Sequence, residues 1–129
     1  MHIKWQAIIV SCVLLAGCGS DQAIIWSATD ASPNGALIAS AHTTQTSGPG
    51  TAFVGTVVTL EQAKIANKIT ILGFSNESAY PSGATAVKLH WLSNSNLDIT
   101  FKPGATIEFQ AIKALGVTIT THEEASPQQ

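Results

Sequence analysis

The chain has 129 residues and little charge: six lysines and no arginine stand against eight acidic residues, for a formal net charge of −2. The lysines are scattered, so the sequence offers no basic face for a phosphate backbone, and nucleic acids are excluded as an expected partner. The absence of a lysine cluster also argues against electrostatic attachment to anionic lipid.

The first 17 residues have the layout of a secretory signal peptide. Lys4 supplies one positive charge near the start, and the apolar run AIIVSCVLLAG covers residues 7–17. A helix needs about 20 apolar residues to cross the hydrocarbon core of a bilayer. The run is roughly half that length, so it predicts a cleaved signal and not a membrane span.

Leu15, Ala16, Gly17 and Cys18 resemble, at all four positions, the lipobox of bacterial lipoprotein precursors. The resemblance implies that the Cys18 thiol receives a diacylglycerol, that the chain is cut between Gly17 and Cys18, and that the new amino group is acylated. Gly19 and not aspartate follows the cysteine, which by the same resemblance favours the outer membrane. The resemblance covers residues 1–18 only. The alternative is an ordinary secretory signal in which Cys18 stands by chance.

Removal of the 17 residues before Cys18 leaves 112 of the 129 residues, enough for one domain with a sizeable core. Cys12 leaves with the signal, so the remaining chain contains no cysteine pair and must rely on its core for stability. We expect a lipidated tether over residues 18–31, a β domain over residues 32–124 and a disordered tail over residues 125–129.

Two features mark the entry to the domain. Trp26 lies in an apolar part of the tether and is expected to pack on the edge of the domain, the alternative being the membrane interface. Ser32, Pro33, Asn34 and Gly35 are the preferred residues at the four positions of a type I β-turn. The mature sequence opening with this turn resembles small bacterial lipoprotein domains without an assigned activity.

Short β-rich runs separated by turn-forming clusters fill the rest of the domain. They predict an all-β fold of about seven strands, either a single small antiparallel sandwich or a strongly curled sheet. The one helix-like stretch, residues 60–67, is expected to be a turn or a loop. The predicted strands cover residues 36–42, 52–60, 68–74, 86–92, 96–102, 106–112 and 117–122.

Apolar residues alternate between positions 87 and 109, and this alternation predicts a strand register. Placing the apolar sets on one face leaves residues 93–95 as a three-residue loop, with Asn94 suited to a left-handed conformation. A second hairpin is expected through Pro103 and Gly104. The predicted pairs are Trp91–Leu97, Leu89–Ile99, Val87–Phe101, Phe101–Ile107 and Ile99–Phe109.

The same register gathers polar side chains on the opposite face. The candidate residues there are Lys88, His90, Asp98 and Glu108, with His90 opposite Asp98. A histidine beside a carboxylate can perform acid–base chemistry. The alternative is a solvated sheet face whose cross-strand pairs contribute about 0.2–1 kcal/mol each. We expect the solvated face and no catalytic residue, because catalysis needs a concave site.

No motif for nucleophilic, phosphate or metal chemistry is present. The chain lacks G-x-S-x-G and a glycine-rich loop that ends in lysine. Its histidines are isolated, and no thiolate remains for structural zinc, so neither a metal nor a cofactor is expected. A possible contact loop contains Tyr80 and Pro81, since aromatic residues on loops are frequent contact points. The alternative is a tyrosine folded over the sheet edge.

These features predict a lipid-anchored protein of the bacterial envelope, in contact with the membrane through its N-terminal acyl chains and located at the outer membrane. The expected role is that of a binding or accessory module for another envelope protein, for peptidoglycan or for a small apolar ligand. The competing classes are a small periplasmic hydrolase that uses His90 and Asp98, and a purely structural lipoprotein.

Overall fold

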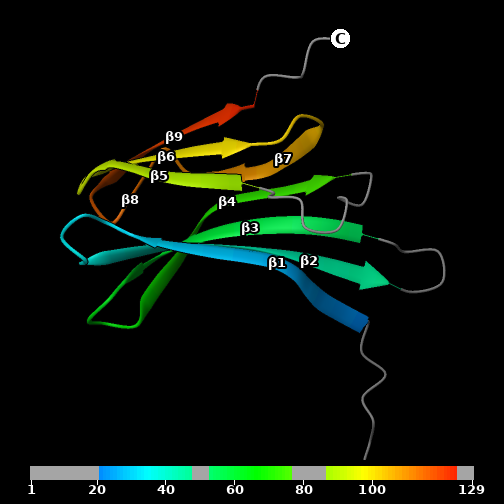
Figure 1. Cartoon of the computed structure of the whole chain (residues 1–129), viewed down its shortest axis with the longest axis horizontal. Coiled ribbons are helices and arrows are strands. Elements are labelled where there is room, and N and C mark those ends of the chain that lie inside the picture. Colours follow the sequence, from blue (N-terminus) through cyan, green and yellow to red (C-terminus); the bar gives the residue numbers. More distant parts are fainter. Residues whose placement is uncertain (1–20, 48–52, 77–86, 125–129) are drawn as a thin grey trace, which may run out of the picture.

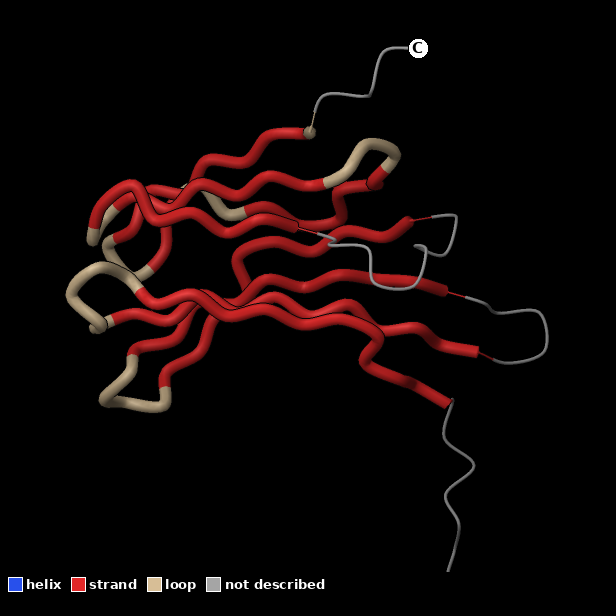
Figure 2. The backbone as a smooth tube through the Cα atoms, viewed as in Figure 1, coloured by secondary structure: helices blue, strands red, loops and turns tan. Residues whose placement is uncertain are grey.

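The structure is a computed structural model that describes residues 21–47, 53–76 and 87–124. These residues form nine strands in two sheets that pack face to face (Figures 1 and 2). The predicted all-β sandwich is therefore confirmed, with two strands more than the sequence indicated. None of the described residues belongs to a helix long and apolar enough to cross a bilayer.

The two sheets have five and four strands. In the first sheet, every neighbouring pair is antiparallel, and the spatial order is β1 (Asp21–Ala31), β2 (Leu37–Ser47), β3 (Phe53–Gln62), β4 (Asn67–Asn76) and β7 (Ala105–Gln110). In the second sheet, the order is β5 (Val87–Ser93), β6 (Asn96–Phe101), β9 (Val117–Glu123) and β8 (Lys113–Ala114). Within it, β6 and β9 run parallel, while the other two pairs are antiparallel. The stretch over residues 60–67 is not helical: residues 63–66 form the turn between β3 and β4, and the others belong to these two strands.

The core fills the space between the sheets. Leu60 and Leu72 of the first sheet and Leu97 and Ile99 of the second are fully buried and belong to one apolar cluster. Along β6, Leu97 and Ile99 are buried while the residues between and beside them are more exposed. This alternation is the period of two expected for strands with one face on a core.

The predicted register between β5 and β6 is confirmed. Val87 pairs with Phe101, Leu89 with Ile99 and Trp91 with Leu97. The loop differs from the prediction: a bulge between Trp91 and Ser93 lets Ser93 pair with Asn96, which shortens the connection. Asn94 does not adopt the left-handed conformation that we expected. Among the non-glycine residues that the structure describes, a positive φ occurs at Leu115.

The second predicted hairpin, between β6 and β7, is wrong. β7 crosses to the first sheet, where Ile107 pairs with Phe74 and Phe109 with Gly73 of β4. The physical reason is that β6 already has a neighbour on each side, β5 and β9, so it has no free edge for β7. Gly104, with φ of 89°, lies in the turn at the crossing, and its N–H donates to Glu123 Oε1 at 3.1 Å.

The predicted tether also needs correction. From Asp21 onward these residues form β1, an edge strand that pairs with β2 along its length. A bulge between Ile24 and Trp26 changes the alternation there. Trp26 is half-buried against the core, which confirms the expected packing on the domain. The sequence suggested a tether because β1 lacks a continuous apolar alternation. Backbone pairing with β2 makes this segment a strand nevertheless.

The turn predicted at the entry to the domain is present. The Gly35 N–H donates to the Ser32 carbonyl at 2.8 Å. The buried Ser32 hydroxyl accepts from the Leu37 N–H and donates to Asn34 Oδ1. The Asn34 N–H in turn donates to Asn94 Oδ1 at 2.9 Å. This last bond joins the β1–β2 turn of one sheet to the β5–β6 turn of the other.

Gly116→Ala is expected to lower the free energy of unfolding by about 1–2 kcal/mol, the cost of a left-handed conformation for an L residue. Gly116 has φ of 76° in the turn between β8 and β9, and no atom lies within 4 Å of a Cβ built there. The cost is therefore due to the backbone alone. Urea unfolding measures it.

Gly73→Ala is the matched control for Gly116→Ala. A Cβ at Gly73 would meet the Phe109 Cβ at 4.0 Å, an ordinary contact, and Gly73 lies in β4 without a positive φ. Alanine there is expected to maintain or raise stability by up to about 1 kcal/mol, because it reduces the entropy of the unfolded chain. Equal losses in the two variants would contradict the backbone explanation.

Candidate functional site

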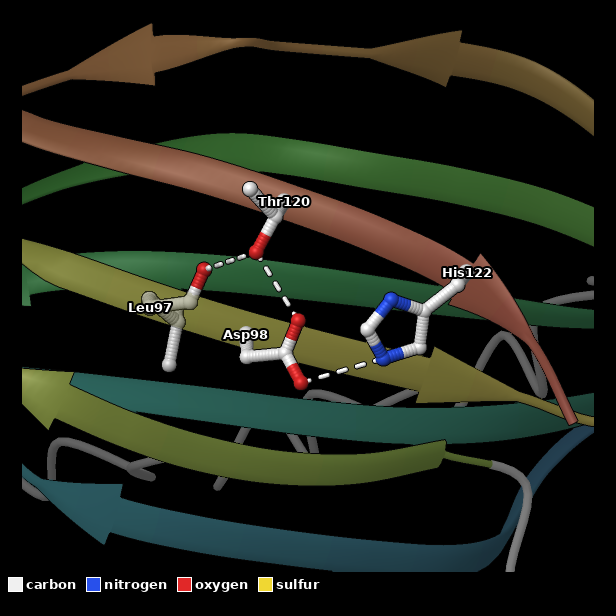
Figure 3. A network of polar contacts seen from close by, with 4 residues as sticks. All are labelled: Leu97, Asp98, Thr120 and His122. Carbon is white, nitrogen blue, oxygen red and sulfur yellow. Dashed lines mark hydrogen bonds and ion pairs between the residues drawn. The ribbon is translucent and has the colours of Figure 1, made fainter.

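Asp98 is the centre of a polar network on the outer face of the second sheet (Figure 3). Its carboxylate accepts a hydrogen bond from Thr120 Oγ1 at 2.8 Å, and His122 Nε2 lies 3.0 Å from Asp98 Oδ2. Thr120 Oγ1 also lies 3.4 Å from the carbonyl oxygen of Leu97. The two oxygens of one carboxylate are thus used by two side chains of β9.

The parallel pairing of β6 and β9 produces this network. Asp98 stands opposite Thr120, and Thr100 stands opposite His122. Because Leu97, Ile99 and Ile119 are buried in the core, the residues that alternate with them point outward. His122 is therefore the next outward-facing residue of β9 after Thr120, and its side chain reaches Asp98 diagonally across the two strands.

The network lies at the surface. The side chains of Asp98 and His122 are 20% and 55% exposed, so solvent screens their interaction. Beside it, Lys88 of β5 forms an exposed ion pair with Glu124 at 3.4 Å. These are polar pairs between strands on a solvent-exposed sheet face.

The geometry of Asp98, His122 and Thr120 differs from that of a nucleophilic triad. In a triad, one imidazole nitrogen contacts the carboxylate and the other accepts the proton of the nucleophile. Here the Thr120 hydroxyl is bonded to the carboxylate itself, and no described hydroxyl is hydrogen-bonded to His122 Nδ1. The carboxylate orients an imidazole, but this part of the chain supplies no activated nucleophile to it.

The structure places the predicted site residues as follows. His90 stands opposite Asp98, as predicted, yet the carboxylate contacts His122 and not His90. Lys88, His90 and Asp98 share the second sheet, whereas Glu108 lies on β7 of the first sheet, so its predicted place on the same face is wrong. Gly17, Cys18, Tyr80 and Pro81 lie outside the described residues.

No group of three or more histidine, cysteine, aspartate or glutamate side chains suited to a metal ion occurs within the described ranges. Thr120 and His122 are the residues of the network that sequence reasoning missed. The alternation of Val117 and Ile119 with polar residues indicates that His122 faces outward. It does not indicate that β9 pairs with β6.

A pocket of about 470 Å³ lies at one end of the sandwich, lined by residues 34–37, Gln62, Lys64, Ile65 and Leu115. These residues lie in or directly beside three turns: the one that enters β2, the one between β3 and β4, and the one between β8 and β9. None of the polar residues around Asp98 lines it. The sequence could not predict this pocket, because its walls come from segments that are distant in the chain.

The pocket combines apolar side chains with one cation. Ile65 is 66% exposed, and Leu115 is half-buried against the core with φ of 50°. A non-glycine residue in this conformation stores strain of about 1–3 kcal/mol and is often found at functional sites. Within the described part of the chain, no acidic group lies within 4.0 Å of the Lys64 ammonium. The pocket suits a ligand with an apolar part and an anionic group.

Asp98→Ala and His122→Ala are each expected to change the free energy of unfolding by less than about 1 kcal/mol, since exposed ion pairs contribute about 0.2–1 kcal/mol. The double variant measures their coupling energy by thermal or urea unfolding. His90→Ala is the matched control and should show no coupling to Asp98, because the structure gives the two side chains no contact. A stronger coupling to His90 than to His122 would contradict the geometry in Figure 3.

No model of a protein family, no curated protein and no solved structure matches this chain.

Proposed function

We propose that this chain is a bacterial lipoprotein whose β-sandwich is a binding module, held at the outer membrane by acyl chains on Cys18. One observation carries the binding part of the proposal: the start of β1 and the pocket lie at opposite ends of the sandwich. An anchor at one end leaves the other end free for a partner.

The path of β1 supports this arrangement. β1 starts at Asp21, three positions after Cys18, and its 11 residues lead to the Ser32 turn beside the pocket. A strand of this length spans about 30–35 Å. In Figure 1 β1 starts at the right, and the β1–β2 and β3–β4 turns lie at the left. The anchor therefore holds the pocket end away from the bilayer.

The pocket end suits a binding role because hydrogen bonds hold the turn that enters β2 in place. Hydrogen bonds from Ser32 and Asn34 hold the first turn, and the Asn34–Asn94 bond ties it to the second sheet. Binding residues are often found on loops that a rigid scaffold positions. Lys64 and Ile65 on the neighbouring turn add a cation and an apolar contact.

The anchor is tested by producing the full chain in a Gram-negative bacterium, alongside Cys18→Ser. The wild-type product is expected to lack residues 1–17, to carry the mass of acyl chains, and to sediment with the outer membrane. Three acyl chains anchor firmly, whereas a single chain binds only marginally. Cys18→Ser should lose both the acyl mass and the sedimentation. A wild-type product without acyl mass would contradict the anchor.

The binding role is tested by crosslinking in cells from a photoreactive residue at Ile65. The matched control carries the same group at Thr106, an exposed residue near the start of β7 and outside the pocket lining. The proposal expects one discrete adduct from position 65 and none from position 106. Identical adducts from both positions, or none from position 65, would contradict a binding role for the pocket end.

A further inference from the structure

Two isoleucines form an exposed apolar pair near the start of β1. Ile24 is 67% exposed and Ile25 is 42% exposed. Ile25 is the extra residue of the bulge and has no partner on β2, while Ile24 pairs with Thr44. In Figures 1 and 2 β1 bends in its first part, where it stays paired with β2. The pair therefore lies near the start of an edge strand, with both side chains exposed.

The spacing from Cys18 places this pair close to the site of lipidation. Three residue steps separate Cys18 from Asp21, and an extended chain spans at most about 10 Å over that distance. Ile24 lies a further three residues along the strand, about 10 Å away. Acyl chains on Cys18 would hold the start of β1 at the bilayer surface, with both isoleucines within about 20 Å of the anchor.

We infer that Ile24 and Ile25 insert into the interfacial region of the bilayer that holds the acyl chains of Cys18. This inference rests on the proposed function, since it needs the anchor. Burial in the boundary between headgroups and acyl chains removes both side chains from water. β1 contains no lysine or arginine, so the contact is apolar and not electrostatic.

The contact gives the domain a fixed orientation. An anchor alone fixes one point of the chain, and the domain could rotate about it. A second contact along β1 restricts that rotation and directs the pocket end away from the membrane. The bulge has a role in this arrangement, because it lets Trp26 pack on the core while the residues just before it remain exposed.

The test uses a fluorescent label at Gln22, which is exposed and lies two residues before Ile24, on the same side of the strand. The lipidated full chain carries Gln22→Cys labelled with an environment-sensitive nitrobenzoxadiazole group. Acylation occupies Cys18, and Cys12 leaves with the signal, so the introduced cysteine is the one free thiol. The matched control carries the label at Ala63→Cys, an exposed position in the β3–β4 turn.

Both proteins are reconstituted in phosphatidylethanolamine and phosphatidylglycerol vesicles, with and without brominated acyl chains. The label at position 22 is expected to emit at shorter wavelength and to be quenched by the brominated lipid, whereas the label at position 63 is not. Ile24→Ser with Ile25→Ser should remove the shift and the quenching at position 22, although the protein still floats with the vesicles.

The outcomes separate this inference from the proposed function. A wild-type chain without acyl mass that does not float with vesicles overturns both. A lipidated chain that floats, but whose label at position 22 is quenched no more than the label at position 63, overturns the insertion and leaves the anchor standing. Quenching that persists in the double serine variant overturns the role of the two isoleucines.

Discussion

Replacement of Trp91 by alanine is expected to lower the free energy of unfolding by about 3–5 kcal/mol, the usual cost of deleting a large aromatic side chain from a core. Trp91 is 8% exposed and belongs to the main apolar cluster. Its indole Nε1–H donates to the carbonyl oxygen of Asp30 at 3.1 Å. Asp30 lies on β1 and Trp91 on β5, so this side chain joins the edges of the two sheets.

Trp91→Phe separates the two contributions. Phenylalanine preserves most of the apolar packing but removes the donor to the part-buried Asp30 carbonyl, and a hydrogen bond of this kind contributes about 0.5–1.5 kcal/mol. Urea unfolding followed by circular dichroism measures all variants, since removal of Trp91 also alters the fluorescence. A domain of this size has a total stability of about 5–15 kcal/mol, so Trp91→Ala would lose a large part of it.

Leu92→Ala is the matched control for Trp91→Ala. Leu92 is the next residue of β5 but is 60% exposed, so its truncation is expected to stay within about 0.5 kcal/mol of the wild type. A loss at Leu92 as large as that at Trp91 would contradict the assignment of the core face. A loss in Trp91→Phe as large as that in Trp91→Ala would show that the hydrogen bond, and not the packing, dominates.

The β5–β6 hairpin illustrates what this sequence can predict. The two strands are adjacent in the chain and joined by a short connection, so pairing between them is the simplest arrangement. A slip of one residue would turn Leu97 and Ile99 outward, which fixes the register. The same reasoning correctly located seven strands and the turn at Ser32, because turn-forming residues separate the apolar runs.

The placement of β7 and β9 could not be predicted in the same way. Alternation indicates which side of a strand faces the core, but it does not identify the neighbouring strand. β7 has the alternation expected for a partner of β6, yet it joins β4, and the free side of β6 goes to the distant β9. The contact between Asp98 and His122 depends on that parallel pairing, so the sequence suggested His90 instead.

The alternation also fails at the edge of the first sheet. In β1 the bulge interrupts the period of two, so Ile24 and Ile25 are both exposed and Trp26 follows directly as an inward residue. In a regular strand, successive side chains point to opposite faces, so three consecutive apolar residues do not indicate which face lies on the core. The sequence therefore indicated a tether, although the backbone pairs with β2. Bulges of this kind commonly occur at sheet edges.

Thr43→Val is expected to lower the free energy of unfolding by about 1–3 kcal/mol, because it leaves a buried hydroxyl without a partner. Thr43 and Thr56 stand opposite each other on β2 and β3, and their Oγ1 atoms lie 2.8 Å apart. Their exposures are 0% and 1%, so water cannot replace the lost bond. Valine has nearly the same shape as threonine, and the loss would therefore come from the hydroxyl and not from a cavity.

Thr43→Val combined with Thr56→Val is expected to recover most of this loss, because replacing both partners of a buried hydrogen bond by apolar groups of the same shape is close to neutral. Urea unfolding of the two single variants and the double variant measures the coupling energy.

Thr29→Val, at an exposed position of β1, is the control and should stay within about 0.5 kcal/mol of the wild type. Additive losses in the double variant would contradict a direct bond. Recovery would indicate that the hydroxyl pair contributes to the alignment of β2 with β3 more than to net stability, since a shifted register would place one buried hydroxyl against an apolar neighbour.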